Sequence, residues 1–295
     1  MSIRFFTDSH HAPERTPTRP FRYCEQSLPL IKDCLDSVGK DCEAVVFGGD
    51  AIQVAKDKPR AHYETLMAEF GAAARQSPVP FYAIAGNHEY DYFRDLDKLS
   101  ALSGVAYGNK VIDLQDGQRL ILVNEEFHCK EEVTLFPFSD HALDFVRHAV
   151  ESAPGNMVTL VTHTPIDDFD SYFTKIVIRD FDPEYSFRSN AADLRAILED
   201  SGKNCLVLSG HTHYENFSSK ANVAYMTVQS LVEGVRTATQ ETVFGRWVDI
   251  TRDNDTDLHI KLHGYKGHDI VHRFPPITSQ RPQQDNQAAP LLAAE

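Results

Sequence analysis

The sequence lacks a long hydrophobic run and an N-terminal leader. A membrane-spanning helix needs about 20 consecutive apolar residues, and no stretch of the 295-residue chain approaches that length. A β-prone segment, Ile3 to Thr7, starts almost at the first residue and leaves no room for a signal peptide. These two absences predict a cytoplasmic protein that has no membrane partner.

Cysteine is scarce and shows no paired spacing. The chain has an odd number of cysteines, five, and none of them forms a C-x-x-C pair. This pattern argues against a disulfide framework and against a zinc ribbon. We predict reduced thiols, mostly buried, at Cys24, Cys34, Cys42, Cys129 and Cys205.

Positive charge is also in deficit. The chain has 29 Lys and Arg residues against 43 Asp and Glu residues, a formal net charge of −14. Such a balance repels a polyanion, so a nucleic-acid polymer is not an expected partner unless metal ions reverse the field locally. With 42% hydrophobic and 24% charged residues, the composition is that of a globular protein. The sequence leaves open whether the protein forms homo-oligomers.

Apolar strand-like runs alternate with helical patterns along the chain. Apolar residues recur with helical spacing over 25–38, where Pro29 is tolerated if it lies in the first turn. Further helices are predicted over 59–75, over 139–150 with Ser139 as the N-cap, and over 190–199. Strands are predicted at 3–7, 44–47, 81–85, 111–114, 120–123, 158–161, 205–208, 223–228, 246–250 and 258–263. This alternation predicts a layered α/β fold, in which the late strands form a second sheet or an antiparallel extension.

No internal repeat and no obvious domain boundary interrupts this pattern. We predict one domain over residues 1–277 and a loose C-terminal tail over 278–295, because the tail has little apolar periodicity. The segment 164–190 is long, irregular and rich in aromatic and acidic residues. Long irregular segments in compact domains are often functional loops, and both a lid over the leaving group and an oligomer contact are open for this one.

Polar residues of a few chemical kinds follow the ends of five predicted strands. They are Asp8 and His10, Asp50, Asn87 and His88, His163, and His211 and His213. In open α/β sheets, ligands collect at the carboxyl ends of the strands. Carboxylate, amide and imidazole without thiolate fit Mn, Fe or Zn. Eight donors are more than one ion needs, and they suit two ions about 3.5 to 4 Å apart with one carboxylate bridging them.

Glycines stand immediately before several of these residues, at Gly48, Gly49, Gly86 and Gly210. We expect the chain to turn sharply there, with backbone conformations that a Cβ atom would oppose. A glycine at these places also leaves the metal cavity open.

The blocks Asp8-x-His10, Gly49-Asp50, Gly86-Asn87-His88-Glu89, His163 and Gly210-His211-x-His213 resemble the metallophosphoesterase superfamily, the calcineurin-like phosphoesterases. All five blocks occur in the family's order, over residues 8–213. The resemblance implies a four-layer α/β/β/α sandwich, in which two mixed β-sheets are flanked by helices. Within the superfamily, the chain resembles the small phosphodiesterases of bacterial type.

The resemblance also implies residue roles. Asp8, His10 and His213 would bind one metal ion, and Asn87, His163 and His211 would bind the other. Asp50 would bridge the two ions, and His88 would face the substrate phosphate as a proton donor or charge stabiliser. His11 adjoins the first block, but the pattern gives it no role.

These roles predict hydrolysis of a small phosphodiester or similar phosphate ester by metal-bound hydroxide. Two cations offset the negative charge of the ester, and an imidazole can protonate the departing alkoxide near neutral pH. Two alternatives remain open. One is a phosphomonoesterase, such as a nucleotidase or a protein phosphatase, and the other is a binding protein that kept the fold and lost the chemistry.

A basic and aromatic stretch follows the first block and contains Arg15, Arg19, Phe21, Arg22 and Tyr23. Two interpretations are open: an ordinary surface loop, and a rim that recognises an anionic or nucleobase part of the substrate. Arg22-Tyr23, taken with residues 86–90, resembles the manganese-dependent ADP-ribose and CDP-alcohol diphosphatases. That likeness is too short to assign the substrate.

Overall fold

The computed structural model describes residues 1–15, 20–53, 57–93, 95–124, 128–130, 133–135, 138–167, 190–236, 242–244, 247–254, 256–264 and 267–276. The predicted tail at 278–295 and nearly all of the segment 164–190 lie outside the described residues, so both remain predictions. The helices are η1 (Cys24–Gln26, a 3-10 turn), α1 (Ser27–Asp36), α2 (Arg60–Ala74), α3 (Asn87–Tyr90), α4 (Leu96–Ser103), α5 (Asp140–Glu151) and α8 (Ala191–Glu199). None of the described helices combines the length and the apolar composition that crossing a bilayer requires.

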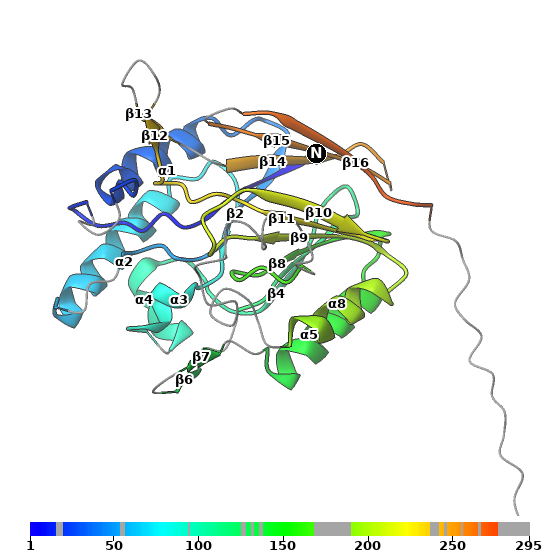
Figure 1. Ribbon diagram of the computed structural model, residues 1–295, viewed down its shortest axis with the longest axis horizontal. Coiled ribbons are helices and arrows are strands. Elements are labelled where there is room, and N and C mark those ends of the chain that lie inside the picture. Colours follow the sequence, from blue (N-terminus) through cyan, green and yellow to red (C-terminus); the bar gives the residue numbers. More distant parts are fainter. Residues whose placement is uncertain are drawn as a thin grey trace, which may run out of the picture.

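Two six-stranded mixed sheets form the centre of the molecule (Figure 1). The first sheet has the order β16 (Asp269–Arg273), β15 (Asp257–Leu262), β14 (Trp247–Arg252), β1 (Ser2–Phe6), β2 (Cys42–Phe47) and β3 (Phe81–Ala83). The second has the order β10 (Asn216–Lys220), β11 (Val223–Thr227), β9 (Asn204–Ser209), β8 (Met157–Val161), β5 (Arg119–Leu122) and β4 (Lys110–Asp113). Two short antiparallel pairs are β6 (His128–Lys130) with β7 (Val133–Leu135), and β12 (Val235–Arg236) with β13 (Thr242–Val243).

Each sheet contains a block of parallel strands. In the first sheet β1, β2 and β3 are parallel neighbours at one end, and β14, β15 and β16 join antiparallel on the other side of β1. In the second sheet β5, β8, β9 and β11 form the parallel centre, and β4 and β10 join antiparallel at the two edges. Strands covered on both faces need apolar side chains in both directions, which is why β2 and β9 could be recognised by the unbroken apolar runs 44–47 and 205–208, and β8 by a run that Thr159 alone interrupts.

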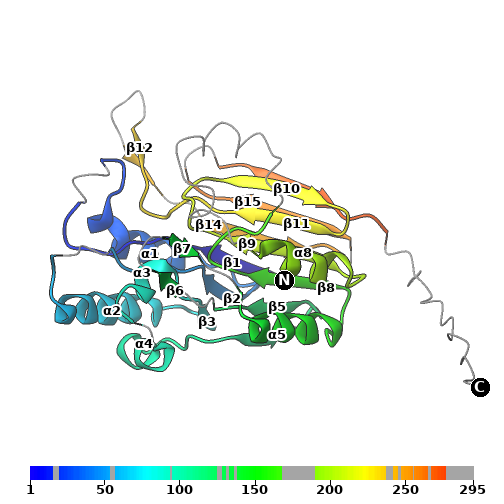
Figure 2. The same cartoon turned by 60° about the horizontal axis from the view of Figure 1, so that its bottom comes forward.

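Three apolar cores separate four layers. One core lies between the sheets and contains Phe5 and Leu208. A second core, around Phe70, joins the outer face of the first sheet to α1, α2 and α4. A third, around Val146, joins the outer face of the second sheet to α5 and α8, which lie side by side in Figures 1 and 2. This α/β/β/α arrangement confirms the predicted fold class.

Local sequence signals for several elements are also confirmed. Pro29 lies in the first turn of α1. Ser139 precedes α5, and its hydroxyl accepts the backbone N–H of Ala142 at 3.2 Å. Cys24, Cys34, Cys42 and Cys205 are buried free thiols. The helices α3 and α4 and the strands β10 and β16 were not predicted.

Arg4 is a buried cation on the central strand β1. Its side chain is 2% exposed and reaches the Asp249 carboxylate on β14 through two N–H···O contacts of 2.7 Å. A further guanidinium nitrogen donates to the carbonyl of Cys34 and, at 2.7 Å, to the hydroxyl of Ser37. Arg4 therefore links the first sheet to the end of α1, and its burial is tolerated because each described contact satisfies a donor.

We predict that Arg4→Leu lowers the free energy of unfolding by about 3 kcal/mol, because it removes the buried cation that pairs with Asp249 and leaves that carboxylate with its 2.8 Å contact to Nε2 of His263. Urea unfolding of the two proteins measures the difference. Arg273→Leu is the control, because Arg273 pairs with Asp257 through a side chain that is 78% exposed, and it should leave the midpoint unchanged. Equal midpoints for both variants would contradict the structural role of Arg4.

Candidate metal centre

Five strand ends converge between the two sheets. Because β1, β2 and β3 are parallel neighbours, their carboxyl ends share one edge of the first sheet, and the same holds for β8 and β9 in the second. The residues that follow these ends are Asp8 and His10 after β1, Asp50 after β2, Asn87 and His88 at the start of α3, His163 after β8, and His211 and His213 after β9. The fold brings all eight candidate residues into one polar cluster.

The first donor group consists of Asp8, His10, Asp50 and His213. One ligand atom of each lies within 4.8 Å of the others, and all four residues are buried. Nε2 of His213 is 2.9 Å from Nε2 of His10 and 3.1 Å from Oδ1 of Asp8. Three ligand atoms, two from the loop after β1 and one from the loop after β9, therefore face one common point.

The second donor group consists of Asp50, His163 and His211, whose ligand atoms also lie within 4.8 Å of one another, together with Asn87. Oδ1 of Asn87 is 3.2 Å from Nε2 of His163 and 2.9 Å from Nδ1 of His211. Nδ1 of His163 is 2.8 Å from the carbonyl of Gly48. A proton on that Nδ1 is donated to the carbonyl, which leaves the Nε2 lone pair facing the group.

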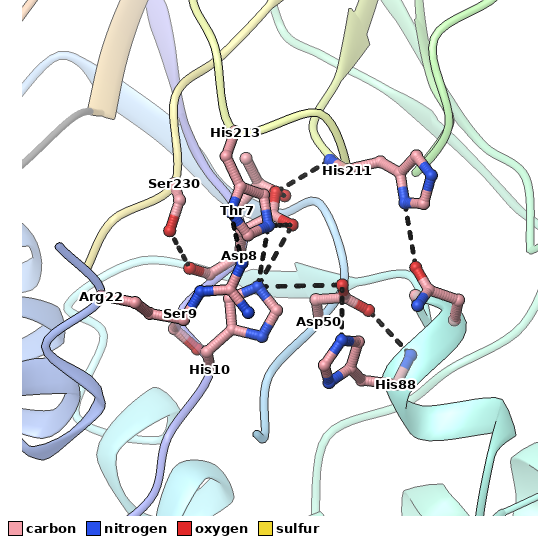
Figure 3. A network of polar contacts seen from close by, with 12 residues as sticks. Thr7, Asp8, Ser9, His10, Arg22, Asp50, His88, His211, His213 and Ser230 are labelled. Atoms are coloured by element: carbon pink, nitrogen blue, oxygen red, sulfur yellow. Dashed lines mark hydrogen bonds and ion pairs between the residues drawn. The ribbon is translucent and has the colours of Figure 1, made fainter. Parts of the chain in front are cut away.

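Asp50 belongs to both groups. Its Oδ1 is 3.4 Å from Nε2 of His163, and its Oδ2 is 3.9 Å from Nε2 of His10. Figure 3 shows Asp50 in the middle of the network, with His10 and His213 on one side and His211 on the other. A carboxylate whose two oxygens face different donor groups has the geometry of a bridging ligand.

His88 borders the first donor group. Its Nε2 is 3.9 Å from Oδ2 of Asp50, and its ring meets that of His10 edge-on at a centroid distance of 4.6 Å. The backbone N–H of His88 donates to Oδ1 of Asp50 at 2.9 Å. Its side chain is 18% exposed, whereas that of Asp8 has no exposure. His88 therefore touches both the buried cluster and solvent.

The backbone is strained at the candidate ligands themselves. Left-handed φ angles occur at Asp8 (54°), His10 (40°), Asp50 (58°), His211 (65°) and His213 (63°). Among the other described non-glycine residues, Ala221 alone shares this conformation. Each such residue costs roughly 1 to 2 kcal/mol, and strain of this kind concentrates at functional sites.

The glycines before the ligands serve one of the two predicted purposes. Of the four, Gly49 alone has a left-handed φ, of 99°. The others are required by close approach instead. A Cβ atom on Gly86 would lie 2.2 Å from Oδ1 of Asp50, and one on Gly210 would lie 2.2 Å from Oδ2 of Asp8. The expectation of unusual backbone at all four glycines was therefore wrong, whereas the expectation that they leave space was right.

Glu89 organises the loop that carries Asp50. Its carboxylate is fully buried and accepts the backbone N–H groups of Asp50 (2.9 Å), Ala51 (2.7 Å), Ile52 (3.3 Å) and Gly86 (2.7 Å). Burial and the charge of Asp50 raise the pKa of Glu89 to about 8, and the N–H groups of Gly86 and Ile52 oppose the rise. Glu89 thus ties the end of β2 to the start of α3.

The donor set fits divalent metal ions. Ligand atoms about 2.1 Å from one ion lie about 2.9 to 3.5 Å from each other at ordinary bond angles, and the contacts of 2.9 and 3.1 Å around Nε2 of His213 agree with this spacing. Oδ2 of Asp8 accepts the Thr7 hydroxyl and the backbone N–H of His211. Oδ1 of Asp8 is buried and has no hydrogen-bond partner among the described residues. An unsatisfied buried carboxylate oxygen amid imidazole nitrogens is a feature that a cation would satisfy.

The pKa shifts in the cluster also favour the binding of divalent cations. Burial opposes ionisation of Asp8 and Asp50, but His213 for Asp8 and His163 for Asp50 hold the pKa of each carboxyl well below its usual range. Burial lowers and Asp50 raises the pKa of His163, which reaches about 9. In the metal-free chain, protons on imidazoles therefore neutralise the two carboxylates. Divalent cations supply the same charge and displace those protons.

Residues 1–215 match the model of the calcineurin-like phosphoesterase family. The chain belongs to this family. The matched range contains all eight candidate residues, and the match confirms the resemblance that the motif blocks carry. Membership and the donor cluster together indicate a metal-dependent phosphoesterase. Among curated proteins, no sequence match was found.

Solved structures share the calcineurin-like phosphoesterase fold with this chain. A dimetal phosphatase from Danio rerio has a TM-score of 0.70 at 13% identity, over 93% of this chain and 99% of that one. PhoD has a TM-score of 0.56 at 10% identity, over 92% and 68%. A putative 5'-nucleotidase from Staphylococcus aureus, in complex with alpha-ketoglutarate, has a TM-score of 0.55 at 14% identity, over 95% and 56%. At identities this low, the structural similarity establishes a common fold alone.

The contacts that two residues make to His213 at this calcineurin-like site were not predicted from the sequence. Glu233 lies beyond the matched range, and its Oε1 is 2.7 Å from Nδ1 of His213. Arg22 was expected in a surface loop or on a substrate rim, but it is 7% exposed, and its Nη2 is 2.8 Å from the same Nδ1 (Figure 3). A lone Glu in an irregular segment has no sequence signal that could have revealed this role.

We predict that the metal-free protein loses stability as pH rises from about 6.5 to 9. His163 titrates near 6.5 when unfolded and near 9 when folded. Its contribution is therefore complete below pH 6.5 and disappears as pH rises through 9. His213, whose pKa is also raised, and Glu89 add slopes of the same sign. Urea unfolding in a chelator should show a flatter profile for His163→Gln than for the wild type, and parallel profiles would contradict the assignment.

Proposed function

We propose that the protein is a dinuclear metal-dependent hydrolase of a phosphodiester or similar small phosphate ester. The observation that carries the proposal is the pair of donor groups that share the Asp50 carboxylate. Asp8, His10 and His213 would hold one ion, Asn87, His163 and His211 would hold the other, and Asp50 would bridge them. Imidazole, carboxylate and amide ligands suit Mn, Fe or Zn.

Two divalent ions in this site would offset the charge of the phosphate ester and lower the pKa of a water molecule. The chain's own contribution is to fix the donors before substrate arrives. The left-handed residues, the Glu89 carboxylate and the Gly48 carbonyl each restrict a ligand to one orientation. A fixed polar environment of this kind needs no rearrangement during the reaction.

His88 is the proposed partner of the leaving group. Burial lowers the pKa of its imidazole, Asp50 opposes this, and the charge of Arg22 lowers the pKa further. The ring is therefore mostly neutral at pH 7 before substrate binds. An anionic phosphate ester beside it would raise that pKa again, and the imidazole would then hydrogen-bond or protonate the departing oxygen.

The phosphomonoesterase alternative concerns the same site. The similar structures described as a dimetal phosphatase and a putative 5'-nucleotidase keep it open. Hydrolysis of bis(p-nitrophenyl) phosphate and of p-nitrophenyl phosphate by one preparation separates the two, because the diester has one negative charge and the monoester two. Faster turnover of the diester supports our proposal, and faster turnover of the monoester supports the alternative. A protein that binds no divalent metal would instead support a binding role.

We predict that Asp50→Asn loses bound metal and lowers diester hydrolysis by more than about a hundredfold, because a neutral amide cannot bridge two cations. His211→Ala should lose the ion of the second donor group and keep that of the first. Metal content after gel filtration and the initial rate are measured on the same samples. Glu69→Ala is the control, since Glu69 touches His11 outside both donor groups. Unchanged metal content and rate in Asp50→Asn would show that the site assignment is wrong.

We predict that His88→Ala keeps both metal ions and loses turnover by about 10²- to 10⁴-fold. The loss should be larger for diesters with poor leaving groups, because those need the imidazole most. Rates are compared for a nitrophenyl ester and an alkyl ester of the same phosphate. Equal losses for the two esters would argue against a role at the leaving group.

A further inference from the structure

The imidazole of His213 is held between two sets of contacts. Nε2 faces the first donor group, where it is 2.9 Å from Nε2 of His10 and 3.1 Å from Oδ1 of Asp8. Nδ1 faces away from the group, toward Oε1 of Glu233 at 2.7 Å and Nη2 of Arg22 at 2.8 Å. The two contacts at Nδ1 require opposite states of that nitrogen.

The choice between these contacts decides what Nε2 can do. When Nδ1 carries the proton of a neutral ring, it donates to Glu233, and Nε2 presents a lone pair to the first donor group. When Nδ1 accepts an N–H from Arg22, the ring proton lies on Nε2. Only the first arrangement allows Nε2 to bind a metal ion.

Glu233 is held rigidly in the position that favours the first arrangement. On one side of it, the backbone N–H of Leu231 donates to the carbonyl of Thr7 at 3.1 Å. On the other, residues 21–23 pair with 232–234 through bonds of 2.9 Å (Tyr23 N–H to Val232) and 3.0 Å (Gly234 N–H to Phe21). The segment around Glu233 is therefore tied both to the strand end that carries Asp8 and to the segment that carries Arg22.

Arg22 keeps Glu233 charged and in place. Its Nε and Nη2 are both 3.4 Å from Oε1 of Glu233, and its Nη1 donates to Oε1 of Gln53 at 3.0 Å. These contacts place the carboxylate of Glu233 between the guanidinium of Arg22 and Nδ1 of His213. An imidazole N–H makes its stronger hydrogen bonds to a charged acceptor of this kind.

We propose that Glu233 is a positioning residue of the metal centre, which takes the Nδ1 proton of His213 and so directs the Nε2 lone pair at the first donor group. The inference rests on the proposed function, because it requires His213 to be a metal ligand. Arg22 acts on His213 through Glu233. If the carboxylate is withdrawn, Arg22 becomes the partner of Nδ1 and stabilises the arrangement that cannot bind metal.

The competing explanation is that Glu233 and Arg22 form an ordinary ion pair that joins two loops. Two conservative variants distinguish these roles. Glu233→Gln keeps an oxygen within reach of Nδ1 but loses the charge that pairs with Arg22. Glu233→Asp keeps the charge but is one methylene too short to reach Nδ1. If Glu233 positions His213, metal binding should weaken more in Glu233→Asp than in Glu233→Gln. If Glu233 and Arg22 form an ordinary ion pair between loops, metal binding should weaken more in Glu233→Gln.

The experiment is calorimetric titration of the full chain, stripped with a chelator, with Mn²⁺ alone. We expect two binding events in the wild type. In Glu233→Asp and Glu233→Ala, one event should weaken by about 10- to 100-fold and the other should stay unchanged, with a loss below about tenfold in Glu233→Gln. Glu69→Ala is the matched control, because Glu69 makes a 2.7 Å contact to His11 in the loop after β1, which also carries Asp8. Both binding events should be unchanged in this variant.

Each outcome assigns a cause. Two wild-type events with Glu233→Asp equal to the wild type, or with Gln worse than Asp, overturn the positioning role and leave the proposed function standing. The same weakening in Glu69→Ala also overturns it, because the effect would then be a general disturbance of the loops. A wild type that binds no Mn²⁺ overturns the proposed function and this inference together. If Glu233→Ala does not fold, the order of the Asp and Gln variants still decides.

Discussion

The site depends on placing the Asp50 carboxylate, a buried negative charge, where two sheets meet. A buried carboxylate is unfavourable without a counter-charge, so everything around it supplies either positive charge or orientation. His163 and His10 face its two oxygens, and Gly86 has no Cβ that would collide with it. Glu89 orients the same loop from behind through backbone N–H groups. The glutamate receives the hydrogen bonds of the loop, so the aspartate oxygens remain directed at the donor groups.

The strained backbone at the ligands is stabilised by a ladder that continues beyond the strands. After β1 and β2 end, Asp8 still donates to Gly49 and His10 to Asp50 at 2.9 Å, and His11 donates to Ala51 at 2.7 Å. These bonds bind the two loops together through the left-handed residues. A left-handed residue costs roughly 1 to 2 kcal/mol, and a net hydrogen bond contributes about 1 kcal/mol, so paired loops can offset much of the strain. The pairing of these two loops therefore helps to stabilise the left-handed backbone at Asp8, His10 and Asp50.

The sequence predicted the strands that are marked by apolar runs and the candidate ligands that follow them. β2, β8 and β9 are largely buried on both faces. Residues 44–47 and 205–208 read as unbroken apolar runs, Thr159 alone interrupts the run in β8, and each strand delivers a candidate ligand at its end. The edge strands β10 and β16 were missed because one side of each is solvated: β10 reads as Asn216–Lys220 with no apolar run, and in β16 Val271 is 73% exposed. Strain at Asp8 and Asp50 was missed because left-handed backbone is normally signalled by glycine or asparagine. Here tertiary contacts, and no local preference, impose it.

The part of the chain beyond residue 215 also restrains the site. β14 pairs with β1 so that Asp249 lies opposite Arg4, and this pairing covers the edge of the strand that carries Asp8 and His10. Earlier in this part of the chain, the Ser230 hydroxyl donates to the carbonyl of Asp8 at 2.8 Å, and the backbone N–H of Leu231 donates to the carbonyl of Thr7. Asp8 is thus restrained from both sides, by the loop after β2 and by residues 230–231. Because the family model ends before these contacts, motif blocks alone identify the donors but not the restraint that holds them in a left-handed conformation.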